Sequence, residues 1–373
     1  MYTLHENDIV EEKISNDMKI ISEYIVSSVE NVKAIFLTGG FGRGEGSVIV
    51  ENNRCQPLND YDLVVIADSL PKEKLINSMR LTLAELCGIR QVDLSLMRSE
   101  SLSNLNFTMS NYDLATSSKA IYGSADILKR IPRWSPKKLP LVEGVVPLFL
   151  FLSSIIQAYP KQQDLTQNQL FWSYQQLTKS ILGWSTAMLI FKGLYDPSYY
   201  KRNKIFQKHF AKDKDLCELV RLATNFKLYP TLKPCDETQL TKLWEVVKDS
   251  HLRTLKLLLP EFYNFQFKTW DHLISRHKRS MANITKAVLS IILRRHYYYD
   301  CLNTDLAKLY LCLSIGNDNP DFLSESKQCF KRISSIKNRQ KISDDLNLYL
   351  DQLVKADINS QIFSERGDDI FYE

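Results

Sequence analysis

The sequence predicts an α+β fold in which a small mixed-sheet domain precedes an all-α helical domain. Five of the 12 glycines lie between Gly39 and Gly46, where the backbone must turn sharply or approach a ligand closely. Short β-rich runs alternate with amphipathic helices over the first 125 residues, which is typical of a small domain that contains a sheet. Beyond residue 141 the spacing of apolar residues is helical almost to the end, which predicts the second domain.

Each element of the first domain has its own local signal. Apolar residues at helical spacing predict a helix over residues 8–30. A second amphipathic helix is expected over residues 72–86, closed by Gly88. Alternating or β-rich runs predict four strands, at residues 32–37, 62–67, 89–97 and 120–122.

A basic stretch with three prolines, residues 126–141, is interpreted as a linker between the two domains. This interpretation assigns residues 1–125 to the first domain and residues 142–373 to the helical domain. The expected helices of the second domain lie near 144–158, 167–193, 200–225, 236–259, 264–297, 303–314, 321–335 and 341–356.

Composition narrows the class of protein. A net charge of +5 permits an anionic ligand such as a nucleotide without requiring nucleic acid. The seven cysteines show no CxxC spacing, which argues against a zinc site or a disulfide framework and favours a reducing, cytoplasmic location. The most apolar run, residues 145–158, is shorter than the roughly 20 residues that a membrane span needs. We therefore expect no membrane partner.

The first candidate site feature is the segment from Leu37 to Glu45, where a predicted strand runs into a glycine-rich turn. Such a turn presents backbone N–H groups that can hold phosphate oxygens. The segment does not match GxxxxGK[ST], so it is not a P-loop. Taken alone, it is compatible both with phosphate binding and with an ordinary tight turn.

Three aspartates form the second feature. Asp60 and Asp62 are two residues apart at the start of a predicted strand, so their side chains share one face. Their mutual repulsion would be relieved by a divalent cation placed between them and a triphosphate. Asp93 lies within an alternating apolar strand, where an aspartate is unusual unless it is paired or bound to a metal. The simpler alternatives are a polar turn for the pair and a solvent-facing edge position for Asp93.

In this order, the Gly-Gly turn, the DYD pair and the VDLSL strand resemble the nucleotidyltransferase signature of the DNA polymerase β superfamily. The segment GGFGRGE, residues 39–45, is similar to the glycine segment of the bacterial PII uridylyltransferases. The resemblance covers roughly residues 32–125 and implies that residues 1–125 form a nucleotidyltransferase catalytic domain. Compared with the family, residues 47–58 are an insertion, which we interpret as an added hairpin or a flexible loop.

The resemblance implies chemistry for the three aspartates. Asp60, Asp62 and Asp93 would be the catalytic carboxylates and the ligands of Mg²⁺ or Mn²⁺. Asp93 occupies the position of the family's third carboxylate, which is often credited as the general base.

The resemblance also implies where the NTP donor is held. The backbone of three glycines would hold its β- and γ-phosphates: Gly39, Gly40 and Gly42. Arg43 is a candidate cation for the departing pyrophosphate, with an ion pair to Glu45 as the alternative. Lys179, on a predicted helix of the second domain, is a candidate to reach the triphosphate.

The predicted activity is transfer of NMP from an NTP to a hydroxyl of a small-molecule acceptor, with the helical domain forming the acceptor wall as in antibiotic nucleotidyltransferases. One alternative acceptor is a protein side chain or an RNA 3′ end, as in toxin-like nucleotidyltransferases. Its support is the basic, aromatic-rich segment 264–300. A further alternative is a catalytically silent nucleotide-binding module with the same fold.

Overall fold

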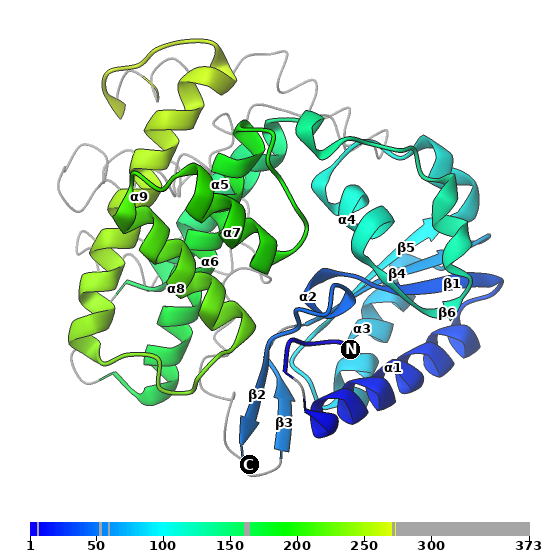
Figure 1. The fold of residues 1–373 in the computed structure, drawn as a ribbon. Helices are drawn as coiled ribbons and strands as arrows, with labels where there is room; N and C mark the ends of the chain where they lie inside the picture. Colours follow the sequence, from blue (N-terminus) through cyan, green and yellow to red (C-terminus); the bar gives the residue numbers. More distant parts are fainter. Residues whose placement is uncertain (6, 52–53, 59, 160–164, 271–272, 274–373) are drawn as a thin grey trace, which may run out of the picture. The chain divides into compact units, whose positions relative to one another are not determined.

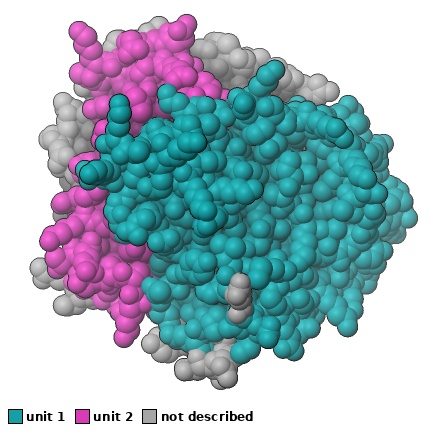
Figure 2. Space-filling model, viewed as in Figure 1, with its two compact units in different colours: residues 1–140, 192–232 teal, residues 141–191, 233–373 magenta. Residues whose placement is uncertain are grey.

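The computed structural model of the protein describes residues 1–5, 7–51, 54–58, 60–159, 165–270 and 273. The chain divides into two compact units, coloured separately in Figure 2. Unit 1 consists of Met1–Pro140 and Lys192–Leu232, whereas unit 2 consists of Leu141–Phe191 and the chain from Lys233 onward. The chain therefore leaves unit 1, enters unit 2 and returns to unit 1 before it continues.

Unit 1 is built on a four-stranded mixed sheet with the strand order β5-β4-β1-β6 (Figure 1). β1 pairs antiparallel with β4 and with β6, while β4 and β5 run parallel. The predicted mixed sheet is thereby confirmed. Its strands are β1 (Val32–Leu37), β4 (Tyr61–Ala67), β5 (Val92–Arg98) and β6 (Lys119–Gly123).

Two helices, α1 (Asp8–Ser28) and α3 (Glu73–Cys87), cover one face of the sheet (Figure 1). Their apolar side chains form a single core with the odd-numbered residues of β1 and β4, such as Ile35 and Val65. α3 ends where Gly88 adopts a left-handed conformation with φ of 62°, as the sequence predicts.

The opposite face carries α4 (Met109–Ser117) and a second core, to which the even-numbered strand residues Phe36 and Ile66 contribute. Ile131 is buried in this core, with Trp134 packed against it. This differs from the expectation that residues 126–141 form a linker, because the apolar residues of that stretch pack onto unit 1. In the structure, the first segment of unit 1 therefore ends at Pro140, later than the boundary that the sequence predicts at residue 125.

The segment 47–58 forms a hairpin, one of the two conformations expected for it. β2 (Val48–Glu51) pairs antiparallel with β3 (Arg54–Pro57). The buried side chain of Val48 packs into the same core as α1 and α3. The hairpin is therefore anchored in unit 1.

Residues 192–232 contribute two helices to unit 1, α7 (Tyr199–His209) and α8 (Lys214–Leu228). The sequence predicts one continuous helix here and assigns it to the second domain. The helix is interrupted because Asp213 caps the start of α8, accepting a hydrogen bond from Leu216 N–H at 3.2 Å.

Among its described residues, unit 2 is formed by α5 (Val142–Gln157), α6 (Gln167–Phe191) and α9 (Glu237–Tyr263), which pack against one another. All three were expected from helical spacing. α9 ends where Asn264 adopts a left-handed conformation. The helix expected from about residue 264 does not begin there, and the next helical residue is Trp270. The helices expected beyond that point lie outside the described residues, apart from the segment up to residue 270 and residue 273. No helix among the described residues is long and apolar enough to cross a membrane.

A polar cluster is enclosed within unit 2. His251 Nε2 lies 2.8 Å from the Leu148 carbonyl oxygen, and His251 Nδ1 lies 2.8 Å from Ser180 Oγ. A carbonyl can only accept, so Nε2 carries the proton and Nδ1 accepts the hydrogen bond that Ser180 donates. Burial lowers the pKa of His251 to about 4, although the hydrogen bond to Leu148 opposes this shift. The histidine is therefore a neutral, structural residue.

The buried histidine predicts a loss of stability in acid. Below a pH of about 6.5 the unfolded chain gains a proton at His251 that the folded chain accepts only near pH 4, so folding is progressively disfavoured. At about 1.4 kcal/mol for each tenfold change in proton affinity, this residue costs about 3 kcal/mol across that range. The measurement is denaturant unfolding of the wild type and His251→Gln between pH 7 and 4. The glutamine retains a donor and an acceptor but no titration, so parallel pH profiles would contradict this account.

Candidate metal centre

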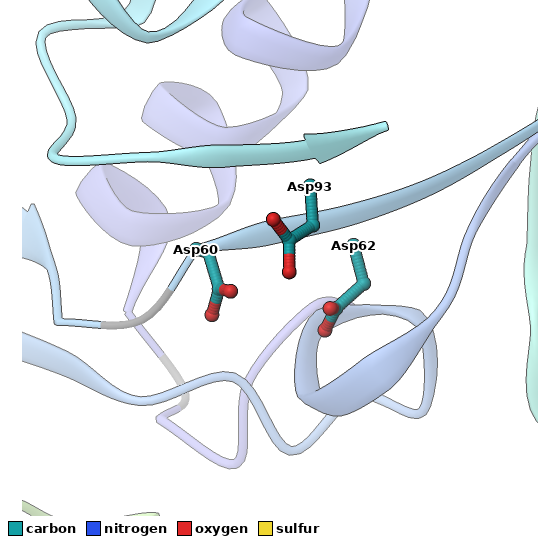
Figure 3. A group of neighbouring side chains, drawn as sticks. All are labelled: Asp60, Asp62 and Asp93. Atoms are coloured by element: carbon teal, nitrogen blue, oxygen red, sulfur yellow. The ribbon is translucent and has the colours of Figure 1, made fainter. Parts of the chain in front are cut away.

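Three aspartates meet at one end of the four-stranded sheet (Figure 3). Asp62 is the second residue of β4, and its partner across the parallel pair is Asp93 of β5. Asp60 precedes β4, and the two-residue repeat of extended chain directs it to the same face as Asp62. One carboxylate oxygen from each residue lies within 4.8 Å of the others. The structure therefore brings together all three aspartates that the sequence singles out.

The three carboxylates differ in their surroundings. Asp60 and Asp62 are half-buried, whereas Asp93 is exposed and accepts a hydrogen bond from Gln91 Nε2 at 2.7 Å. Burial, together with the negative charges of Asp60 and Asp93, raises the pKa of Asp62 to about 7. The site thus concentrates negative charge that a cation would stabilise.

The glycine turn lies directly against Asp62. After β1 the chain forms a single helical turn, α2 (Gly39–Gly42). A Cβ atom on Gly39 would lie 1.7 Å from Asp62 Oδ2, and the φ of Gly39 is +60°. Gly39 is therefore required both by the backbone conformation and by the close approach of the carboxylate.

Gly42 has a different role. Its N–H donates to the Thr38 carbonyl at 2.9 Å, and a Cβ atom there would lie 2.3 Å from the Leu37 carbonyl oxygen. The Gly42 N–H therefore already has an acceptor within the turn, whereas the predicted contact with phosphate requires a free N–H. For Gly39 and Gly40 that assignment stays a prediction, and the first amides of a helical turn have no acceptor within the helix.

Arg43 belongs to a buried network of ion pairs. Its Nη1 lies 3.3 Å from Asp113 Oδ2, and its Nε lies 3.8 Å from Glu45 Oε2. Asp113 also accepts a hydrogen bond from the Tyr195 hydroxyl at 2.8 Å. The ion pair between Arg43 and Glu45, which the sequence offers as an alternative, is therefore present. Asp113 is a closer partner of Arg43 than Glu45 is, and only 9% of the Arg43 side chain is exposed. A contact of Arg43 with phosphate stays a prediction.

Glu45 links the glycine turn to the start of α7. Its carboxylate accepts hydrogen bonds from Ser198 Oγ at 2.6 Å, Tyr199 N–H at 2.7 Å and Tyr200 N–H at 3.1 Å. A carboxylate at this position satisfies free amides and interacts favourably with the positive end of the helix dipole. The carboxylate of Glu45, the last residue of GGFGRGE, therefore has a structural role, because it binds the start of a helix more than 150 residues further along the chain.

Removal of this buried carboxylate should destabilise unit 1. Glu45→Ala is expected to lower the free energy of unfolding by about 3 kcal/mol, because it removes the acceptor of the Tyr199 and Tyr200 amides at the start of α7 and one partner of Arg43. Chemical denaturation measures the loss. The matched control is Glu218→Ala, whose ion pair with Arg221 is exposed and should contribute little. Equal effects in the two variants would contradict the capping role.

Lys227 of α8 acts electrostatically on Asp62, and sequence analysis missed it. The ring centroid of Tyr199 lies 4.2 Å from Arg202 Cζ, 5.3 Å from Arg43 Cζ and 5.5 Å from Lys227 Nζ. Burial raises the pKa of Tyr199, but these positive charges lower it on balance. The positive charges of Lys227 and Arg43 also partly offset the rise in the pKa of Asp62 that burial and the neighbouring aspartates cause. Nothing in the local sequence distinguishes Lys227 from the other lysines on amphipathic helices.

Lys179, the lysine that the sequence suggests, lies on α6 of unit 2. Its Nζ lies 5.8 Å from the ring centroid of Trp172. Its contact with a triphosphate stays a prediction. The basic segment 264–300 lies largely outside the described residues, so the structure adds nothing to its expected contact with RNA.

No protein-family model matches the sequence, and no curated protein shows significant similarity to it.

Proposed function

We propose that the protein is a metal-dependent nucleotidyltransferase of the DNA polymerase β type. It would transfer NMP from an NTP to a hydroxyl group of a small-molecule acceptor. The observation that carries this proposal is the convergence of Asp60, Asp62 and Asp93 beside Gly39. Carboxylate oxygens are the hard ligands that Mg²⁺ and Mn²⁺ prefer, so the donor set fits these ions.

The reaction is an in-line displacement at the α-phosphorus of the NTP. The acceptor oxygen forms a bond to phosphorus while the bond to the β-phosphate oxygen breaks, and pyrophosphate leaves. Bound divalent cations would neutralise charge on the attacking and leaving oxygens. Asp60 and Asp62 would hold the cation that accompanies the phosphates.

Asp93 would serve the acceptor. It is the exposed member of the group and lies beside Asp62 in the sheet register, so an acceptor hydroxyl can approach it from solvent. In the reaction its carboxylate would take the hydroxyl proton, with Gln91 holding one of its oxygens at 2.7 Å.

The leaving pyrophosphate needs positive charge, and two groups supply it near Asp62. The positive charges of Arg43 and Lys227 both act on the Asp62 carboxylate, where they partly offset the rise in its pKa. They come from the glycine turn and from the end of α8, and both belong to unit 1. These cations, with the amides of Gly39 and Gly40, would hold the β- and γ-phosphates.

A thermal-shift screen of the four NTPs, each with Mg²⁺ or Mn²⁺, tests the proposal. A ligand at 100 times its Kd stabilises the native state by about 2.7 kcal/mol, so the correct NTP should raise Tm by about 5 °C or more. Radiolabelled NTP is then incubated with the protein and a small-molecule extract. Absence of any metal-dependent shift would refute the proposal. A shift without transfer to any acceptor, protein and RNA included, would indicate a silent nucleotide-binding module.

A further inference from the structure

We propose that Tyr61 is the positioning residue of the metal centre, because its buried hydroxyl, held by Asp17 of α1, fixes the two aspartates that flank it in the sequence. This inference rests on the proposed function. It concerns the face of β4 opposite to the carboxylates, where sequence analysis identified no site residue.

The hydroxyl of Tyr61 takes part in a closed polar link inside the core. It donates to Asp17 Oδ2 at 2.6 Å, and Tyr61 and Asp17 are 0% and 2% exposed. Lys13 Nζ lies 2.6 and 2.7 Å from the two oxygens of Asp17 and donates to the Cys87 carbonyl at 2.9 Å. The carboxylate of Asp17 is thus held from both sides, by a side chain of its own helix and by the strand.

The alternation of the strand transmits this restraint to the metal centre. Tyr61 projects into the core beneath α1, whereas Asp60 and Asp62 project from the other face. The three residues share consecutive peptide planes, so a twist or slide of the strand moves all of them together. A hydrogen bond that fixes the tip of Tyr61 therefore restricts the direction of both carboxylates.

Tyr61 also contacts the glycine turn. Its ring lies edge-on to Phe41 of α2, with centroids 5.0 Å apart and an interplanar angle of 74°. Phe41 is itself confined, because a Cβ atom on Gly46 would lie 2.1 Å from its Cδ1. One side chain therefore touches both the strand that carries the metal ligands and the turn expected to hold phosphate.

Stability alone does not explain a polar link at this place. Burial of an aspartate and a phenol costs desolvation free energy, and well-packed apolar side chains often replace such groups without loss of stability. Apolar contacts are not directional, whereas the 2.6 Å hydrogen bond between Tyr61 and Asp17 restricts an angle as well as a distance. The link is suited to orienting β4 beneath the metal centre.

The test compares Mn²⁺ affinity in the full chain, measured by calorimetry well below the melting temperature. Tyr61→Phe removes the hydroxyl and keeps the ring, and should weaken Mn²⁺ binding about tenfold, as loss of an outer-shell partner does. Transfer should show a lower kcat with little change in the KM for NTP. The matched control is Ile21→Val, which weakens the same core from α1 without touching the link and should bind Mn²⁺ as the wild type does.

A second pair of variants tests the other end of the link. Asp17→Asn keeps an oxygen that can accept from Tyr61 and should retain Mn²⁺ affinity within about threefold, whereas Asp17→Ala should lose about tenfold. This pair decides the question if Tyr61→Phe does not fold. Wild-type affinity in Tyr61→Phe or in Asp17→Ala would overturn the positioning role.

Failure of this inference can be separated from failure of the proposed function. If Asp62→Asn weakens Mn²⁺ binding while Tyr61→Phe does not, the metal centre stands and the positioning role falls. If the wild type binds no Mn²⁺, or if Asp62→Asn binds it equally well, both are overturned.

Discussion

Asp62→Asn is expected to lower the rate of nucleotidyl transfer by on the order of 10³-fold or more, which corresponds to about 4 kcal/mol of lost transition-state stabilisation. Asp62 is the central member of the group. It is two residues from Asp60 in the sequence, it pairs with Asp93 across the sheet, and it lies against Gly39 of the glycine turn. A neutral amide of the same shape preserves the packing but removes the charge that would hold a divalent cation.

The assay uses the NTP identified by thermal shift and follows release of pyrophosphate and incorporation of label into the acceptor. The control is Asp126→Asn, which removes an exposed carboxylate from unit 1. Asp126 forms a surface ion pair with Lys129. This variant should transfer at the wild-type rate. Transfer by Asp62→Asn at that same rate would refute the assignment of the metal centre.

Gly39→Ala is expected to reduce Mn²⁺ affinity by about 100-fold or more. The new methyl group would lie 1.7 Å from Asp62 Oδ2, so the carboxylate must move by more than an ångström, and displacement of that size costs about two orders of magnitude at a reacting centre. The left-handed φ of +60° adds about 1 kcal/mol of backbone strain. Calorimetric titration with Mn²⁺ measures the affinity, and chemical denaturation measures the strain.

The chain supplies a matched control at Gly88. Its φ of +62° is nearly the same, but a Cβ atom there meets nothing within 4 Å. Gly88→Ala should therefore show the same backbone strain and bind Mn²⁺ normally. If both alanine variants lose affinity equally, backbone strain rather than the displaced carboxylate is responsible.

Elements with a strong local signal were predicted well. The helix expected over residues 72–86 is α3 (Glu73–Cys87), because its apolar spacing and the closing Gly88 act over one or two turns. α4 was missed, since Leu114 is its one fully buried side chain and leaves little periodic signal. The strand expected at 120–122 is β6, extended by one residue at each end through its pairing with β1.

In the candidate site, too, some features follow from the local sequence and others depend on how the strands pair. Asp60 and Asp62 could be placed on one face from their spacing alone, because strand alternation is a local property. That Asp93 lies opposite Asp62 depends on the parallel register of β4 and β5, which no local pattern specifies. The contact of Asp62 with Gly39 likewise arises only when β1 and β4 pair.

By itself, the sequence determined the main helices and strands and the residue types that could hold a cation, because these follow from side-chain periodicity and charge. Only the tertiary structure placed α7 and α8 in unit 1, joined Glu45 to Tyr199 and brought Lys227 within electrostatic reach of Asp62. The physical reason is that hydrogen bonds and charges act through space. Residues more than 150 positions apart leave no repeating pattern in the chain that connects them.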